Sequence, residues 1–291
     1  MLANLIAEFN STPWAIEPTH YKGLISSVKD PKENFPEGLN ATGKRTQLRQ
    51  TSGKVGILPI MGTIMHRSNE FLDAFGISYT STERLGQQMD ELMRNDGVST
   101  IVARIDSNGG MVKNTPETAE KIFSYRGQGK KLIAVADGDM NSAAIYLGAA
   151  FDEVYVTPSG TAGSVGVIWE HIDDSEFMQS LGFKSELVTY GEHKGEGWGP
   201  MTDSLRERMQ QMVDDAGNQF VSDLARFRGT TAKDVKENYG KGRVLMPKEA
   251  LAVGMVDGIK TFEEVINKLI GATPKTSNSI RRKRLALDQR I

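Results

Sequence analysis

The sequence predicts an α/β fold in which most strands run parallel. Three short apolar runs, 55–60, 100–105 and 131–136, have the composition of buried strands. Helix-like patterns separate the strands at intervals of roughly 20–30 residues, which is the alternation that builds parallel sheets. The chain of 291 residues is long enough for one large domain or two ordinary ones.

The segment before these strands, 1–53, differs in texture from the rest of the chain. It contains Pro13, Pro18, Pro31 and Pro36 among scattered charges. Because proline interrupts both helices and sheets, we expect an N-terminal arm with one or two short helices on a largely irregular path.

Amphipathic periodicity places the helices. In the helix predicted at 81–95, Leu85, Met89 and Leu92 share one face, and Ser81 or Thr82 is the expected N-cap. Helices are predicted, in order, at 81–95, 115–125, 143–150, 173–181, 202–227, 230–238, 247–253 and 261–270. A turn at 137–141 and a further strand at 183–188 complete the prediction.

Composition excludes several classes of protein. Hydrophobic residues make up 38% and charged residues 25%, as in globular proteins, and the net charge of −2 gives no general attraction to nucleic acid or anionic membranes. The absence of cysteine excludes a disulfide framework, thiol catalysis and thiolate metal sites. The four histidines lack zinc-binding spacing and no P-loop motif occurs, so no cofactor or metal is expected.

The sequence gives no signal of secretion or membrane insertion. Its first ten residues lack a basic segment, and Asn4 and Glu8 interrupt their apolar pattern. No run approaches the roughly 20 apolar residues that span a bilayer. We therefore expect a protein that is made and used in solution and has no membrane partner.

Ser142 is the first candidate for chemistry. It directly precedes the run A-A-I-Y-L-G-A-A, which is apolar on nearly every face and must therefore be buried on all sides. Unpaired N–H groups and the positive end of the helix dipole favour developing negative charge at this point. The position suits a serine nucleophile, and it equally suits an ordinary N-cap.

Two further features make a nucleophile more plausible. Gly109 and Gly110 follow a predicted strand and can place an N–H toward an oxyanion, with the N–H of Ala143 as the second donor, although a plain turn fits the glycines as well. Lys194 lies in a glycine-rich loop, where most lysines are merely solvated. A lysine buried beside a serine loses its proton readily, however, and serine–lysine pairs are an established catalytic variant. The histidines leave a serine–histidine arrangement open.

Four motifs in a fixed order resemble the signal peptide peptidase A family of serine proteases. They are D-S-x-G-G from Asp106, A-D-G-D-M-N-S-A-A-I-Y-L-G-A-A from Ala136, A-G-S-V-G-V from Ala162 and G-E-H-K-G from Gly191. The segment from Gly242 to Ile259 is similar to the end of that family's domain, so the resemblance covers about 54–270. The opening P-W-A-I-E-P is similar to the phage branch, the capsid assembly or prohead maturation proteases.

The resemblance implies a Clp-protease/crotonase-like spiral of β-β-α units and a serine endopeptidase that processes viral capsid or scaffold proteins during head assembly. It assigns the nucleophile to Ser142, the general base to Lys194, the lysine-orienting hydroxyl to Ser164, and the oxyanion hole to Gly109 or Gly110 with Ala143. It also implies a homo-oligomeric ring in the host cytoplasm or the prohead interior. Asn108, where the family often has proline, and Ala143-Ala144, where glycine is common, depart from the pattern and leave substrate preference open.

Three regions follow from this reading: an N-terminal arm at 1–53, a Ser-Lys protease domain at 54–272 and a basic C-terminal tail at 273–291. The tail holds six basic residues against Asp288 alone, which is typical of a solvated tail and also fits a binding arm. Two other functions remain open. One is a crotonase-like enzyme acting on acyl-CoA thioesters, and the other is a non-catalytic capsid scaffold whose tail binds shell protein or DNA.

Overall fold

The structure is a computed structural model that describes residues 12–29, 51–52, 54–68, 78–180 and 182–271. The predicted tail at 273–291 and much of the predicted arm at 1–53 lie outside the described residues.

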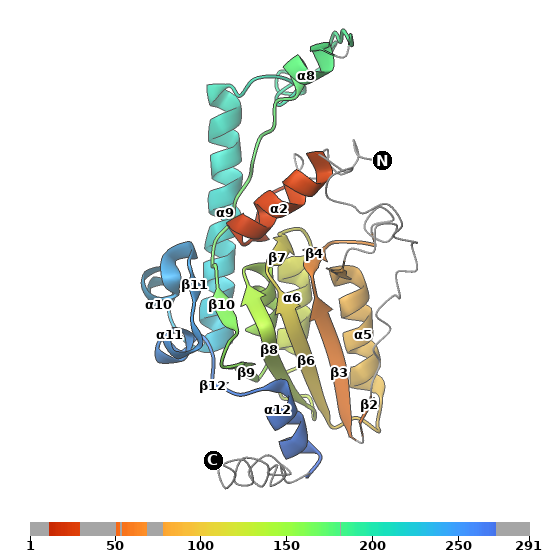
Figure 1. Cartoon of the computed structure of the whole chain (residues 1–291), viewed down its shortest axis with the longest axis vertical. Coiled ribbons are helices and arrows are strands. Elements are labelled where there is room, and N and C mark those ends of the chain that lie inside the picture. The colour runs from red at the N-terminus through yellow and green to blue at the C-terminus, as the bar shows by residue number, and fades with distance from the viewer. Residues whose placement is uncertain (1–11, 30–50, 53, 69–77, 181, 272–291) are drawn as a thin grey trace, which may run out of the picture.

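A large sheet forms the centre of the molecule (Figure 1). Its eight strands follow the order β11-β10-β8-β6-β3-β2, with β9 paired to β8 and β12 to β9. The central pairs β3–β6, β6–β8 and β8–β9 are parallel, which confirms the predicted arrangement. The strands are β2 (Thr51–Ser52), β3 (Val55–Met61), β6 (Thr100–Ser107), β8 (Lys131–Asn141), β9 (Glu153–Val156), β10 (Thr161–Gly163), β11 (Val244–Leu245) and β12 (Gly258–Ile259).

A second, four-stranded sheet lies at the carboxyl ends of these central strands. Its order is β1-β7-β4-β5, made of β1 (Trp14–Ile16), β7 (Gly109–Met111), β4 (Thr63–Met65) and β5 (Tyr79–Ser81). Strand β3 is followed by β4 and β5 of this sheet and then by a helix. Strand β6 is likewise followed by β7 and then by a helix. The chain is therefore built from repeated strand–strand–helix units, and the predicted fold class is confirmed.

The helices after residue 80 lie where the sequence predicts them, within a few residues at each end, and the helix at 18–29 is one of the short helices expected in the N-terminal arm. They are α2 (Pro18–Lys29), α5 (Thr82–Arg94), α6 (Thr115–Ser124), α7 (Ala143–Gly148), α8 (Ser175–Ser180), α9 (Asp203–Arg228), α10 (Ala232–Asn238), α11 (Pro247–Ala252) and α12 (Phe262–Leu269). Ser81 caps α5 by accepting a hydrogen bond from the N–H of Arg84. Asp90 on α5 accepts hydrogen bonds from Lys121 and Tyr125 at 2.7 Å each, which ties α5 to α6.

Two predicted elements are wrong. The segment 137–141 is no turn, because β8 continues through it to Asn141 in register with β10. The segment 183–188 forms no strand. Its apolar side chains are exposed instead, Phe183 at 59% and Val188 at 93%.

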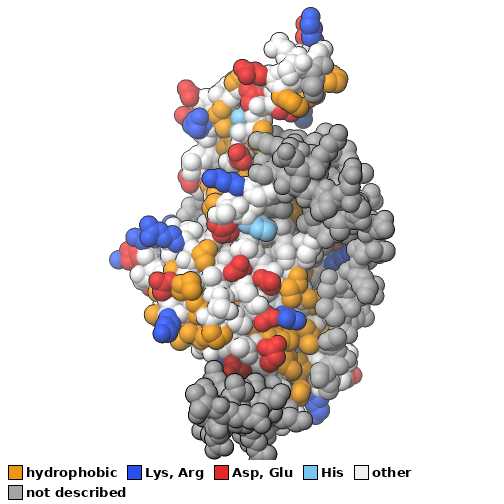
Figure 2. All heavy atoms as spheres, viewed as in Figure 1, with side chains coloured by type: hydrophobic (Ala, Val, Ile, Leu, Met, Phe, Trp, Pro, Cys, Tyr) orange, Lys and Arg blue, Asp and Glu red, His pale blue; other side chains and the backbone are white. Residues whose placement is uncertain are grey.

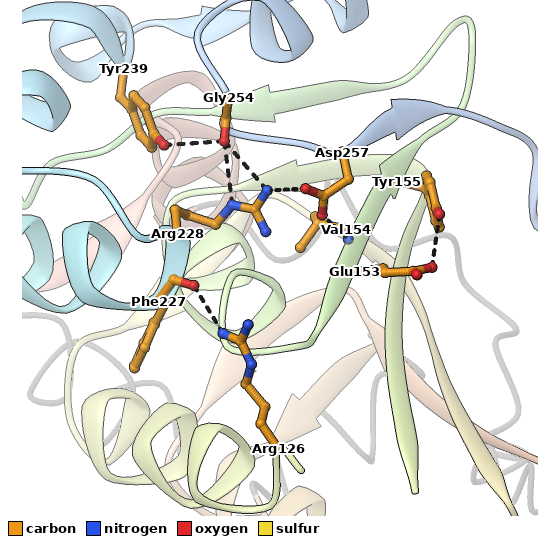
Figure 3. A network of polar contacts seen from close by, with 9 residues as sticks. All are labelled: Arg126, Glu153, Val154, Tyr155, Phe227, Arg228, Tyr239, Gly254 and Asp257. Atoms are coloured by element: carbon orange, nitrogen blue, oxygen red, sulfur yellow. Dashed lines mark hydrogen bonds and ion pairs between the residues drawn. The ribbon is translucent and has the colours of Figure 1, made fainter.

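Among the described residues, the C-terminal part of helix α9 is bonded to the body of the molecule. Arg228, at its end, donates hydrogen bonds to the carbonyl of Gly254 and to Asp257, and Asp257 in turn accepts from the N–H of Val154 at 2.7 Å (Figure 3). The N-terminal part of α9 and the segment containing α8 project beyond the sheets (Figure 1). Within the described part of the chain, no helix has the length and apolar character to cross a membrane.

Candidate active site

Ser142 stands at the junction between β8 and α7. Its backbone has φ 56° and ψ −119°, a conformation that is costly for a residue with a side chain. Its N–H donates to the carbonyl of Gly163 at 2.7 Å, and its own carbonyl accepts from the N–H of Tyr146 at 3.0 Å. The side chain makes no capping hydrogen bond, so Ser142 occupies the N-cap position without acting as an ordinary N-cap.

The hydroxyl of Ser142 is buried and makes no hydrogen bond. The residue is 0% exposed, and its Oγ has no hydrogen-bond partner. A buried hydroxyl without a partner costs about 1–3 kcal/mol. Strain and an unsatisfied polar atom at one serine are the features that mark functional sites.

Ser164 lies beside Ser142 at the end of the neighbouring strand. Strands β8 and β10 are parallel, with Asn141 opposite Gly163, so the two serines follow the last paired residues of adjacent strands. Ser164 also has a positive φ, 53°, and is 4% exposed. Its N–H donates to the carbonyl of Arg243 at 2.8 Å. The fold therefore brings two of the predicted site residues together.

The glycine pair lies on the other side of Ser142. Gly109 has φ 97°, and a Cβ built on it would lie 2.9 Å from the Cβ of Ser142 and 3.1 Å from the nitrogen of Ala143. Gly110 is equally confined, since a Cβ there would lie 1.9 Å from the carbonyl oxygen of Ile64. Ala143 is the first residue of α7, where backbone N–H groups have no partner within the helix. The Gly109 N–H already donates to the Ser107 hydroxyl at 3.2 Å.

A polar network that the sequence analysis missed links these elements. The Asn141 side-chain amide donates to Asn108 at 3.0 Å and to Thr161 at 2.9 Å, which joins β8 to both neighbouring paths of chain. Asp139 accepts from Asn108 at 3.3 Å and from Thr161 at 2.5 Å. The short polar run D-G-D-M-N has the composition of a turn, and only the strand register shows what its side chains bind.

Helix α7 is held against α9 by an aromatic and polar contact. The ring of Tyr146 stacks on Phe220 with centroids 4.3 Å apart and an interplanar angle of 5°. The Tyr146 hydroxyl donates to Asp223 at 2.5 Å. Burial, the hydrogen bond to Asp223 and its negative charge all raise the pKa of Tyr146 well above its ordinary value. The phenol therefore stays protonated and fixes the helix that begins at Ser142.

Lys194 is the predicted site residue that a single chain does not bring to Ser142. It lies in the projecting segment, its side chain is exposed, and its ammonium makes no hydrogen bond or ion pair with another described residue. The histidines do not replace it. His171 contacts the carbonyl of Gly199 and His193 contacts Glu196, while the Ser142 hydroxyl binds none of them.

The described residues contain no group of three or more histidine, cysteine, aspartate or glutamate side chains arranged to hold a metal ion. The arrangement places the Ser142 hydroxyl near the backbone of Gly109 and of Ala143. A serine hydroxyl beside an amide at a helix start can act as the nucleophile of an acyl transfer when a general base is supplied.

Several known proteins are similar in sequence to this chain over most of its length. It is 25% identical over 241 residues to the head-tail preconnector protein GP5 of Enterobacteria phage P21, covering 82% of this chain and 47% of that protein. It is 25% identical over 220 residues to the capsid assembly protease C of Escherichia phage lambda, covering 75% of this chain and 49% of that one. The chain thus spans about half the length of these relatives.

Among solved structures, a ClpP1 mutant from Listeria monocytogenes aligns with a TM-score of 0.43 and 16% identity, over 72% of this chain and 92% of that one. The model of peptidase family S49 matches residues 124–272, which include Ser142, Ser164 and Lys194. This match covers just over half of the chain and agrees with the resemblance found in its motifs. The chain belongs to peptidase family S49.

Proposed function

We propose that this protein is a serine endopeptidase that processes shell or scaffold proteins during the assembly of a viral head. The observation that carries the proposal is the strained, buried and unpartnered hydroxyl of Ser142, placed between Gly109 and Ser164. Family membership supports peptide-bond hydrolysis. The names of the relatives, a capsid assembly protease and a head-tail preconnector protein, support the viral substrate.

In the proposed mechanism, neutral Lys194 accepts the proton of the Ser142 hydroxyl while Oγ attacks the scissile carbonyl. The N–H of Ala143, with an N–H from Gly109 or Gly110, binds the tetrahedral oxyanion, and such a donor contributes roughly 3–4 kcal/mol. The protonated lysine then gives its proton to the leaving amine as the C–N bond breaks. Water attacks the acyl-enzyme, again through Lys194, and restores the serine.

The exposed position of Lys194 supports a dyad that is completed on assembly. The projecting segment that contains it also exposes large apolar side chains, Phe177 at 64%, Tyr190 at 100% and Trp198 at 61%. Figure 2 shows hydrophobic side chains on this projecting part, interspersed with charged ones. Exposed apolar groups on this scale are typical of surfaces that another protein covers. We propose that packing of this segment against a neighbouring copy in a homo-oligomeric ring brings Lys194 to a Ser142.

Complementation tests the proposal. Ser142→Ala and Lys194→Ala are each expected to abolish hydrolysis of an unfolded or viral protein substrate. Lys194→Ala should leave the thermal unfolding midpoint unchanged, and Ser142→Ala should not lower it, because it removes a buried hydroxyl that has no partner. If the dyad forms between copies, mixing the two inactive variants restores activity, because some sites then combine an intact serine with an intact lysine. Lys184→Ala, a change of another lysine on the same segment, serves as the control and leaves turnover unchanged. Full turnover by either single variant would refute the assignment.

The remaining parts of the proposal concern organisation. The division into an arm at 1–53, a protease domain at 54–272 and a basic tail at 273–291 stays a prediction, as does a location in the host cytoplasm or prohead interior. Deleting 273–291 tests the tail. Hydrolysis should persist, and any binding of shell protein or DNA that depends on the tail should be lost.

A further inference from the structure

Strand β1, at Trp14–Ile16, pairs with β7 along one edge and makes a single bridge, at Trp14, on the other. On one edge it runs antiparallel to β7, with Ala15 opposite Gly110. The carbonyl of Pro13 and the N–H of Glu17 extend this ladder to the N–H of Val112 at 3.3 Å and the carbonyl of Asn108 at 2.8 Å. On the other edge, the N–H and carbonyl of Trp14 both pair with Ile168 at 2.8 Å. The sheet therefore ends at β1, and Trp14 alone bridges it to the chain at Ile168.

The two elements that β1 joins are those that flank Ser142. Strand β7 carries Gly109 and Gly110, and Ile168 follows four residues after Ser164. The Ala15 carbonyl oxygen and the Cβ of Ser142 approach the same point, 2.4 and 2.9 Å from where a Gly109 Cβ would be, and the Ala143 nitrogen lies 3.1 Å from it. The backbone of β1 therefore passes directly beside the candidate nucleophile and oxyanion donors.

This path is the one that an extended substrate would need. A peptide cleaved by Ser142 must present its backbone beside that hydroxyl, and adding a strand to a sheet edge is the general way to hold an extended peptide. Here the edge of β7 is already filled. Trp14, Ala15 and Ile16 are each no more than 3% exposed, and Ser142 is fully buried.

We propose that the edge of β7 is the binding site for an extended polypeptide, and that the chain's own Trp14–Ile16 segment occupies it as a tethered blocking strand. The inference rests on the proposed function for its consequence, since displacement of β1 then opens the site to substrate. It also specifies the ligand. The site accepts an extended segment with an aromatic residue, a small residue and a branched aliphatic residue in succession.

A reversible lock tests the proposal in the full chain. Trp14 and Met111 face each other in the ladder between hydrogen-bonded pairs, where antiparallel Cα atoms lie about 4.5 Å apart, within disulfide range. The chain has no cysteine of its own, so Trp14→Cys with Met111→Cys gives one defined disulfide. With a small fluorophosphonate probe, phosphonylation of Ser142, read by mass spectrometry, is expected to be at least tenfold slower in the oxidised protein than in the same protein reduced. Each single-cysteine variant, treated with the same oxidant, is the control and shows no such change.

A second measurement does not depend on the nucleophile. A fluorescent peptide with the sequence of residues 12–18, T-P-W-A-I-E-P, is titrated into the reduced and oxidised forms. We expect binding to the reduced form, loss of binding on oxidation, and no binding of a scrambled peptide. Ala15→Pro, which removes an N–H from β1, should label faster than the unmodified chain.

These measurements separate the two claims. Equal labelling of Ser142 in the locked and unlocked forms, or equal binding of the peptide by both, would overturn the blocking role of β1 and leave the proposed function standing. Peptide binding that the lock abolishes, without labelling of Ser142 in either form, would support the binding edge and refute the nucleophile.

Discussion

Replacing Gly109 by alanine should damage both the fold and the site. Its φ of 97° lies where a side chain costs about 1–2 kcal/mol. The new Cβ would also lie 2.4 Å from the Ala15 carbonyl oxygen, a backbone atom that moves only if β1 moves. Overpacking of this kind costs about 1–3 kcal/mol, so the free energy of unfolding should fall by about 2–5 kcal/mol in total. Because the same Cβ crowds Ser142, hydrolysis should fall about a hundredfold, the effect of a shift of about 1 Å at a reacting group.

Substitutions of two other glycines measure the cost of backbone strain and the cost of steric overlap separately. Gly129 has a similar φ, 84°, and nothing within 4 Å of its Cβ position, so Gly129→Ala should cost only the strain and leave activity intact. Gly110 has no positive φ, but its Cβ would lie 1.9 Å from the Ile64 oxygen, so Gly110→Ala reports collision alone. Urea unfolding and substrate turnover measure all three variants. If Gly109→Ala lost no more stability than Gly129→Ala, the close approach of β1 to the site would be wrong.

Three further predictions follow from hydrogen bonds near the site and between the helices. Tyr146→Phe keeps the aromatic stack but removes the bond to Asp223, and should cost about 2 kcal/mol of unfolding free energy, measured in urea. Asp90→Asn should cost about 1 kcal/mol near pH 7. Burial raises the pKa of Asp90, but bonds from its lysine and tyrosine partners outweigh it and lower the pKa, so the difference between variant and wild type should be present above about pH 4 and vanish as pH falls further. Asn108→Ala removes one partner of the Asn141 amide, worth about 1 kcal/mol, and should slow acylation of Ser142 about fivefold, measured by probe labelling.

The elements that the sequence predicts well are those whose pattern is decided locally. The helix at 81–95 has an apolar stripe and a serine cap, and the structure gives α5 at Thr82–Arg94 with Ser81 as its cap. The run after Ser142 is apolar on every face, and all of α7 is buried. Neither feature depends on residues far away in the chain.

The missed elements depend on distant partners. Asp137, Gly138 and Asn141 favour turns, yet β8 continues through this stretch because partner strands hold it at both ends. Strand β6 pairs with β8 up to Ala136 and again at Met140, across a bulge, and β10 pairs with it from Asp139 to Asn141. The apolar run at 183–188 has strand composition, but no sheet edge of the described chain pairs with it. Strand β1 lies in the segment that the sequence predicts to be a largely irregular arm. A short apolar run between Pro13 and Pro18 was the available signal for it.

The geometry of the site could not be read from the sequence for a related reason. Four residues with positive φ meet there: Gly109 at 97°, Ser142 at 56°, Gly163 at 137° and Ser164 at 53°. Glycine adopts this region freely, but nothing local favours it for serine. The strain at the two serines is imposed by what surrounds them, since parallel strands fix the chain on one side and the buried helix α7 fixes it on the other. A motif can therefore single out Ser142 as a candidate, whereas the strained conformation of that serine is a property of the assembled sheets.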